Sequence, residues 1–500
     1  MNLHDLKHEL KQMLDTIFSI CTSCDLPEIV DQCMIWQSEL DNPLKIAIVG
    51  ITSAGKSTLL NALTKRSIVP TGAETLTYNV NILRHISRSP DNKEGLIVHM
   101  KDGTDEYMPT SELTKLVDGR DSKTSSLRQR IHWVEAYIDY DYLQEIDLID
   151  TPGLLSIQED DSQNTIRLFN DEERRPDVFI YLMQRKVTDK DVEAVRSFQT
   201  MLGSKSTISG LNTIAALTHC DYYSEDDFSI DFHKKAESII ENNRKQFVDF
   251  RSCFSKAFTL AAIYAQSAYA LHADDFCVIQ KLKDKFYDEL LDNLYTKSDF
   301  VDEESIFGEI INGHNNRLKF INRIDMAVIK YSIWWLNKNP NATLENLRDE
   351  LISKSGVKDL DEYVFSKFKR LAIFFKALKL VTNLRKSIEK SIVKQFDSKR
   401  IESLERILIV CRNFEVKLLS HFSFLSVLVD YFNGASYFNE KEWDIALQTI
   451  EECLSETPNK SLLSENENYL LGRKNYYSIL CDTEAIESCE KLITQIKLTV

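Results

Sequence analysis

One short segment near the N-terminus constrains this 500-residue chain more than any other feature. Residues 50–57 read Gly-Ile-Thr-Ser-Ala-Gly-Lys-Ser; the strand-like run 45–49 precedes them, and a helix-forming run begins at Ser57. The two glycines let the backbone curl so that successive N–H groups point at phosphate oxygens, and the helix N-terminus adds partial positive charge. Strand, glycine loop and helix in this order predict a phosphate-binding P-loop rather than an ordinary turn.

The side chains of this loop have distinct predicted roles. Lys56 is expected to reach the β and γ phosphates of a nucleotide, and the Ser57 hydroxyl to ligate Mg²⁺. The predicted nucleotide contacts in this segment are Gly50, Thr52, Ser53, Ala54, Gly55, Lys56, Ser57 and Thr58.

A second motif lies at the end of an apolar run about ninety residues downstream. The run 145–150 ends in Asp150, which can hold Mg²⁺ through water, and Gly153 can offer its N–H to the γ-phosphate. The sequence Asp-Thr-Pro-Gly at 150–153 is typical of guanine-nucleotide sites. The two motifs together predict binding of GTP and GDP.

Base recognition is assigned to the end of the strand-like run 213–218. There Thr218 and His219 precede Asp221, whose carboxylate can accept hydrogen bonds from guanine N1 and N2. Adenine cannot donate in the same way, so it would leave the carboxylate without partners. His219 stands where such sites usually have lysine, and a base-tolerant site is therefore the alternative to guanine specificity.

Composition limits the remaining function classes. A formal net charge of −16 disfavours nonspecific nucleic-acid binding, which requires clustered Lys and Arg, so no nucleic-acid partner is expected. We find neither a signal peptide nor an apolar run long enough for a membrane span, and we expect a cytoplasmic protein with reduced cysteines. Cys21, Cys24 and Cys33 allow a zinc hypothesis, but buried helix cysteines are the favoured interpretation.

The pattern along the chain predicts an α/β P-loop GTPase domain with a doubly wound, mostly parallel sheet, flanked by an N-terminal helical segment and a large C-terminal all-α bundle or stalk. Strand-like runs are 79–84, 96–101, 132–138, 145–150, 177–183 and 213–218, and the run 258–271 is expected to give the last strand and a buried helix. The predicted domains are helices at 1–43, the GTPase domain at 44–265, a bundle or stalk at 266–430 and helical hairpins at 431–500.

Several of these segments resemble the dynamin superfamily of large GTPases, in particular the bacterial dynamin-like proteins. The similarity rests on residues 53–63, on Val69-Pro70-Thr71-Gly72 followed by a threonine-rich switch, and on 150–154. It also rests on Lys101-Asp-Gly and on 132–138, and it covers about residues 44–265.

This resemblance implies roles for further residues. Thr77 would be the switch threonine that contacts Mg²⁺ and the attacking water, with Thr75 as the alternative. Ser53 would help to coordinate a monovalent cation, K⁺ or Na⁺. Thr52 stands where eukaryotic dynamins have a water-orienting glutamine, and Leu154 where many signalling GTPases have one. Basal hydrolysis is therefore expected to be low and to rise when GTPase domains pair; self-association through this domain and the stalk, or with a second dynamin-like protein, is implied.

The helical half offers two weaker signals. Residues 364–400 hold eleven basic and two acidic side chains, and the apolar positions 368, 371, 375, 378 and 382 share one helix face. A lipid-contacting helix, a structural stalk helix and an acidic protein partner are all consistent with this pattern. The candidate membrane or partner residues are Lys369, Arg370, Lys376, Lys379 and Lys386. The spacing within 434–486 is consistent with tetratricopeptide-like repeats or with an ordinary helical hairpin.

Two functions therefore compete. One is a GTPase whose self-assembly is coupled to remodelling of an anionic membrane surface on which it is peripheral. The other is a GTP-switched interaction module without membrane activity.

Overall fold

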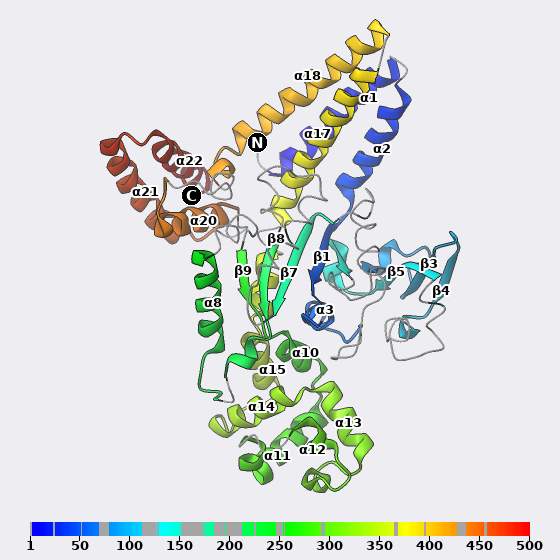
Figure 1. The fold of residues 1–500 in the computed structure, drawn as a ribbon, viewed down its shortest axis with the longest axis vertical. Helices are drawn as coiled ribbons and strands as arrows, with labels where there is room; N and C mark the ends of the chain where they lie inside the picture. Colours follow the sequence, from blue (N-terminus) through cyan, green and yellow to red (C-terminus); the bar gives the residue numbers. More distant parts are fainter. Residues whose placement is uncertain are drawn as a thin grey trace. The chain divides into compact units, whose positions relative to one another are not determined.

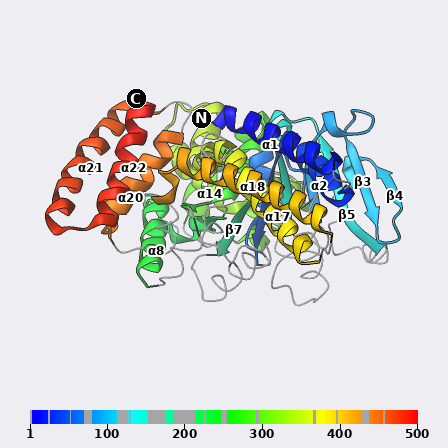
Figure 2. The same ribbon diagram turned by 90° about the horizontal axis from the view of Figure 1, so that it is seen from above.

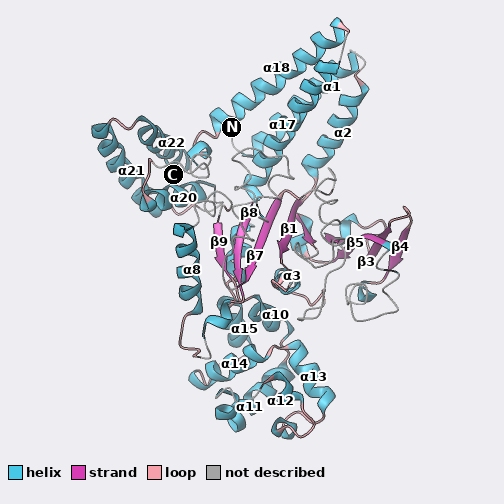
Figure 3. Ribbon diagram, in the orientation of Figure 1, coloured by secondary structure: helices cyan, strands magenta, loops and turns pink. Residues whose placement is uncertain are grey.

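The computed structural model describes residues 3–23, 26–51, 53–69, 80–112, 127, 130–151, 174, 176–184, 195, 213–224, 227–246, 254, 256–291, 296–364, 369–394, 397–427, 437–454 and 458–500. The chain divides into two compact units. We call Lys45–Lys205 with Asn212–Asp361 the sheet unit, and Met1–Leu44 with Glu362–Val500 the helical unit. The predicted fold class, an α/β domain with a large C-terminal helical region, is confirmed (Figure 3).

Nine described strands form one sheet in the order β4-β3-β5-β2-β6-β1-β7-β8-β9. Their bounds are β1 Leu44–Gly50, β2 Val80–His85, β3 Gly95–Met100, β4 Asp105–Met108, β5 Ile131–Ile138, β6 Ile146–Asp150, β7 Val178–Gln184, β8 Thr213–Thr218 and β9 Lys256–Thr259. The strands β1, β7, β8 and β9 pair in parallel, whereas β2 pairs in parallel with β5 and antiparallel with β6. Figure 1 shows β1, β7, β8 and β9 side by side.

The central strands are apolar because both of their faces are covered. All residues of β1 and β8 are buried, as expected for a parallel sheet with helices on its faces. The start of β1 is fastened to β7, since Lys45 N donates to Asp177 Oδ2 at 3.1 Å and Asp177 N donates to Lys45 O at 2.8 Å. Parallel strands in this register bring the carboxyl ends of β1, β7 and β8 to one edge of the sheet, where ligands of such folds bind.

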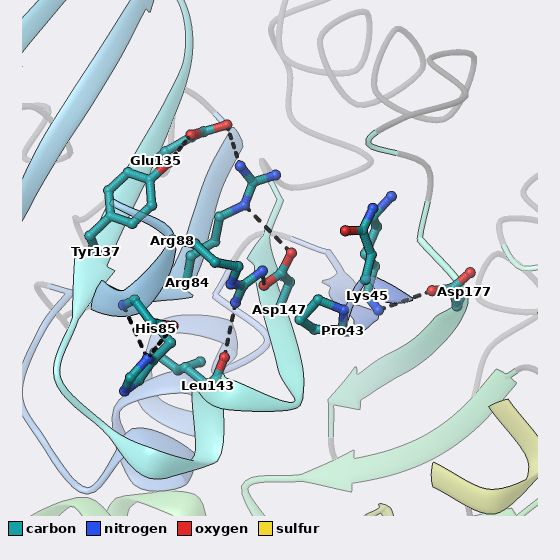
Figure 4. A network of polar contacts seen from close by, with 12 residues as sticks. Pro43, Lys45, Arg84, His85, Arg88, Glu135, Tyr137, Leu143, Asp147 and Asp177 are labelled. Carbon is teal, nitrogen blue, oxygen red and sulfur yellow. Dashed lines mark hydrogen bonds and ion pairs between the residues drawn. The ribbon is translucent and has the colours of Figure 1, made fainter. Parts of the chain in front are cut away.

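Buried ion pairs join β2, β5 and β6 on one face of the sheet (Figure 4). Arg84 Nη1 lies 2.9 Å from Glu135 Oε1, and Arg84 Nε lies 3.5 Å from Asp147 Oδ2. Arg88 Nη1 contacts Asp147 Oδ1 at 2.5 Å, and Tyr137 donates to Glu135 at 2.6 Å. Burial raises the pKa of Glu135, but His99, Arg84 and Tyr137 outweigh it and lower that pKa to about 2. The network therefore pairs the positive charges of Arg84 and Arg88 with the carboxylates of Glu135 and Asp147.

Helices complete the sheet unit. Their bounds are α3 Lys56–Thr64, α8 Phe232–Gln246, α10 Ala262–Ala270, α11 Ala273–Leu291, α12 Lys297–Val301, α13 His314–Arg323, α14 Met326–Lys338, α15 Leu344–Lys354 and α16 Val357–Glu362. One buried apolar cluster runs from Phe179 of β7 through Tyr264 of α10 to Leu347 of α15. Because α10–α15 share the core of the sheet, the boundary between the two units does not coincide with the predicted domain boundary at residue 265.

The helical unit contains α1 Leu3–Ser23, α2 Pro27–Asp41, α17 Lys369–Lys394, α18 Ser398–His421, α20 Glu440–Leu454, α21 Lys460–Leu480 and α22 Thr483–Thr499. The helices α1, α2, α17 and α18 pack together, and α21 and α22 form a hairpin (Figures 1 and 2). Whether this hairpin belongs to a tetratricopeptide-like array stays a prediction, and Gly434 lies outside the described residues.

The helical unit contains the cysteines that were considered for a zinc site. Cys21 and Cys33 are buried thiols, and burial raises the pKa of Cys33 to about 12, while Cys24 lies outside the described residues. Among the described helices, none combines the length and apolarity needed to cross a membrane.

Candidate nucleotide-binding site

The predicted P-loop connects β1 to α3, and its backbone needs both glycines. A Cβ at Gly50 would lie 2.8 Å from the carbonyl oxygen of Leu182 in β7, so this position requires the absence of a side chain. Gly55 has φ +88° and precedes the first residue of α3, a left-handed conformation that glycine adopts without cost. The described residues 53–58 therefore form a loop that ends in a helix N-terminus, as an anion-binding loop requires.

Lys56 is buried with its ammonium group inside the loop. Its Nζ donates to Ile51 O at 3.1 Å and lies 3.3 Å from Gly50 O, and the residue is 7% exposed. Burial lowers the pKa of Lys56, whereas the charge of Asp150 opposes this lowering. A buried ammonium inside a glycine loop, at a helix N-terminus, is suited to neutralise phosphate charge.

The two described residues predicted to ligate magnesium lie on α3 and at the end of β6, two elements that contact each other. Asp150 is fully buried at the end of β6, and Ser57 follows Lys56 in the first turn of α3. Thr151 donates to Ile48 O at 2.9 Å and so fixes the end of β6 beside β1. A hydroxyl and a carboxylate are hard oxygen ligands of the kind that Mg²⁺ prefers, so these residues fit the ion.

The end of β8 is fastened to the loop by two consecutive side chains. Thr218 Oγ1 lies 2.9 Å from Ala54 O and 3.0 Å from Met183 O. His219 Nε2 lies 3.2 Å from Ser53 O, and because a carbonyl only accepts, Nε2 is the donor. His219, which stands at the position where such sites usually have lysine, thus contacts the loop.

Asp221 follows at the start of a 3₁₀ helix, Cys220–Ser224, and is partly exposed. Its charge reaches Tyr264, a buried residue of α10 whose pKa is raised by burial and by Asp221. Tyr222 is 55% exposed, and its ring centroid lies 5.7 Å from that of His219. Tyr264 and Tyr222 were not predicted as neighbours of the base site, because neither motif nor periodicity distinguishes them from core or surface tyrosines.

The remaining predicted residues fall outside the described part of the chain. These are Thr52, Thr75, Thr77, Gly153 and Leu154. The described residues just before the predicted switch are held by Asn61, which is 1% exposed. Its Nδ2 donates to Val69 O at 2.7 Å, and its Oδ1 accepts from the N–H groups of Ile68 and Val69. Asn61 was also missed, because its partners lie seven and eight residues away in a segment without regular structure.

The predicted basic helix is α17. Its described buried positions Phe374, Ala377, Val381, Leu384 and Ile388 pack inside the helical unit, whereas most side chains of the predicted apolar face lie outside the described ones. Lys376 donates to Asn42 O at 2.7 Å, just after the last residue of α2, where a cation favours a helix C-terminus.

Lys386 of α17 is exposed, and the side chains of Lys369, Arg370 and Lys379 lie outside the described ones. Lys376 therefore has a structural contact, whereas a lipid or partner role for this helix stays a prediction.

A sheet in which β1 leads into a lysine-bearing glycine loop and β8 is followed by a carboxylate is the arrangement of P-loop GTPases. Residues 46–215 match the family model described as "Dynamin family".

Two curated relatives are similar to parts of this chain. The "Dynamin-like protein 2" of Campylobacter jejuni is 32% identical over 127 residues, which cover 25% of this chain and 19% of that protein. The "Isoniazid-induced protein IniC" of Mycobacterium tuberculosis is 26% identical over 275 residues, or 54% of this chain and 52% of the relative. The chain thus matches about a fifth and about half of the lengths of these relatives.

A solved structure described as an oligomerised bacterial dynamin pair, which provides a mechanism for long-range sensing and tethering of membranes, is 18% identical to this chain. The comparison covers 91% of this chain and 80% of the other, with a TM-score of 0.35. A TM-score of this size does not establish a common overall arrangement.

Proposed function

We propose that this chain binds and hydrolyses GTP with Mg²⁺. The observation that carries the proposal is the position of Lys56, buried inside a glycine loop at the start of α3, with its ammonium group on the loop carbonyls of Gly50 and Ile51. Lys56 would bind the β and γ phosphates, and Ser57 and Asp150 would hold the metal. Bound Mg²⁺ would supply charge neutralisation on the phosphates. Asp221 would select guanine, and Ser53 and Thr77 would complete the switch side of the site, with K⁺ or Na⁺ as a further ion.

Turnover of GTP by the wild type and by Lys56→Ala tests this proposal. We expect a loss of roughly a hundredfold or more, because the variant lacks the ammonium group at the phosphates. Lys338→Ala, on α14 of the same unit, is the matched control and should retain wild-type turnover. Equal turnover by the wild type and Lys56→Ala would contradict the proposal.

Activation by pairing of GTPase domains is part of the proposal. The predicted site has a leucine at 154 in place of a water-positioning glutamine, so a second molecule would complete it. Turnover per molecule should then rise with protein concentration. A rate independent of concentration would contradict activation by pairing.

We further propose that GTP turnover drives self-assembly on an anionic membrane. The support is the match of residues 46–215 to the dynamin family model together with the exposed basic residues Lys386 and Lys390 of α17. A GTP-switched interaction module is the second candidate, favoured by the burial of the apolar face of α17 inside the helical unit. Flotation with anionic liposomes in the GTP-bound and nucleotide-free states separates the two candidates. Failure to co-float in both states would remove the membrane proposal.

A further inference from the structure

Asn81, the second residue of β2, is a buried polar residue that the site described above does not use. Its side chain is 1% exposed, and among the described residues neither Nδ2 nor Oδ1 has a hydrogen-bond partner. A buried amide with no partner lowers stability, so such groups persist mainly where another molecule or ion supplies the partner. We propose that Asn81 is a positioning residue for the metal-binding carboxylate Asp150 and the water that it shares with Mg²⁺.

The strand register places Asn81 beside Asp150. The two residues are directly opposite each other in the antiparallel pair of β2 and β6. Residues opposite each other in such a pair project from the same face, with Cβ atoms about 4.5–5.5 Å apart. The Asn81 amide therefore lies within reach of one hydrogen bond, or of one water, from the Asp150 carboxylate.

The nearby ion network cannot supply the missing partners. Successive residues of a strand project to opposite faces, so Asp147 and Asp150 lie on different faces of β6. Asp147 binds Arg84 and Arg88 on the face drawn in Figure 4. Asp150 is therefore on the opposite face of β6, a strand that also contacts α3, the helix that begins at Lys56. Asn81 shares this second face.

An amide suits this position because it offers both a donor and an acceptor. Nδ2–H can donate to a carboxylate oxygen of Asp150, and Oδ1 can accept from the O–H of a metal-bound water. Mg²⁺ in nucleotide sites keeps several of its waters, and residues that orient the ligands of a metal commonly change its affinity by 10- to 100-fold. Asn81 also follows directly after the predicted switch, at the start of β2.

The test rests on the proposed function and reads out metal affinity rather than turnover. Release of a fluorescent GDP analogue is measured at increasing free Mg²⁺ for the wild type and for Asn81→Leu, which has a similar size but no polar atoms. We expect the Mg²⁺ concentration that slows release to rise about 10- to 100-fold in the variant. Binding of the same analogue in EDTA should be unchanged, and the melting temperature of the nucleotide-free protein should be equal or higher.

Asn243→Leu is the matched control, because Asn243 is a buried asparagine on α8 whose Nδ2 donates to Ile239 O at 2.8 Å. It should leave the Mg²⁺ dependence unchanged. Asn81→Ala is the second variant if Asn81→Leu does not fold. A Mg²⁺ dependence within twofold of the wild type, or an equal loss of binding in EDTA, would overturn the role of Asn81. Absence of Mg²⁺-dependent release in the wild type itself would instead contradict the proposed function.

Discussion

Replacing Thr218 by valine should weaken both the fold and nucleotide binding. Thr218 is 4% exposed, and its hydroxyl lies 2.9 Å from the carbonyl oxygen of Ala54 in the phosphate loop and 3.0 Å from that of Met183 in β7. Valine has nearly the same shape but no hydroxyl, so the change leaves buried carbonyl groups without this donor. Loss of such a partner costs about 1–3 kcal/mol.

The same free energy sets the upper limit of the effect on binding. If all of it is needed to hold the loop in its binding conformation, the affinity for GTP should fall by about 5- to 150-fold, since about 1.4 kcal/mol corresponds to tenfold. Urea unfolding measures the loss of stability, and titration with a fluorescent GTP analogue measures the loss of affinity. Ser332→Ala is the control, because that buried hydroxyl bonds only within α14, to Val328 O at 2.7 Å. The reasoning would be refuted if the unfolding free energy of Thr218→Val lay within about 0.5 kcal/mol of the wild-type value and its affinity for GTP within twofold.

Three further predictions concern the base site, the ion network and a tight turn. Asp221→Asn should lose affinity for GTP and gain affinity for xanthosine triphosphate, because an amide can donate to the xanthine 2-oxo group. Competition binding measures both affinities. An unchanged preference would show that Asp221 does not select the base. The pKa of Glu135 is lowered from 4.5 to about 2, so its contribution of roughly 3 kcal/mol to the free energy of unfolding is present above pH 5 and is lost as the pH falls towards 2. Glu135→Gln should therefore flatten the acid side of the plot of unfolding free energy against pH. An unaltered plot would contradict this prediction. Gly356→Ala should lower the melting temperature, since Gly356 has φ +70° and a Cβ there would lie 2.3 Å from Thr259 O; calorimetry showing an unchanged midpoint would oppose this.

The sequence predicted the elements whose signal is local. The apolar runs of β1 and β8 and the glycine loop are contiguous, so their positions followed directly from pattern. The strand β4, Asp105–Met108, was missed because it is short, polar and mostly exposed at the sheet edge. The strand β9 begins at Lys256, two residues before the predicted apolar run.

Contacts that depend on the tertiary fold could not be predicted. Asn81 in a strand carries no signal until the register places it opposite Asp150. Lys376 was assigned to a solvated or lipid-facing surface, but its contact with Asn42 joins residues more than three hundred positions apart.

The contact of Lys376 with Asn42 has a mechanical consequence. Asn42 precedes β1 by only two residues, so tension applied to α17 would reach the start of the strand that leads into the phosphate loop. The strand β1 is paired with β7 from Ile46 to Gly50, so a pull along its axis loads these hydrogen bonds in shear, all at the same time. A strand loaded in this way transmits force without unzipping. Residues 42–50 thus form a continuous path along the chain from the Lys376 contact to Gly50.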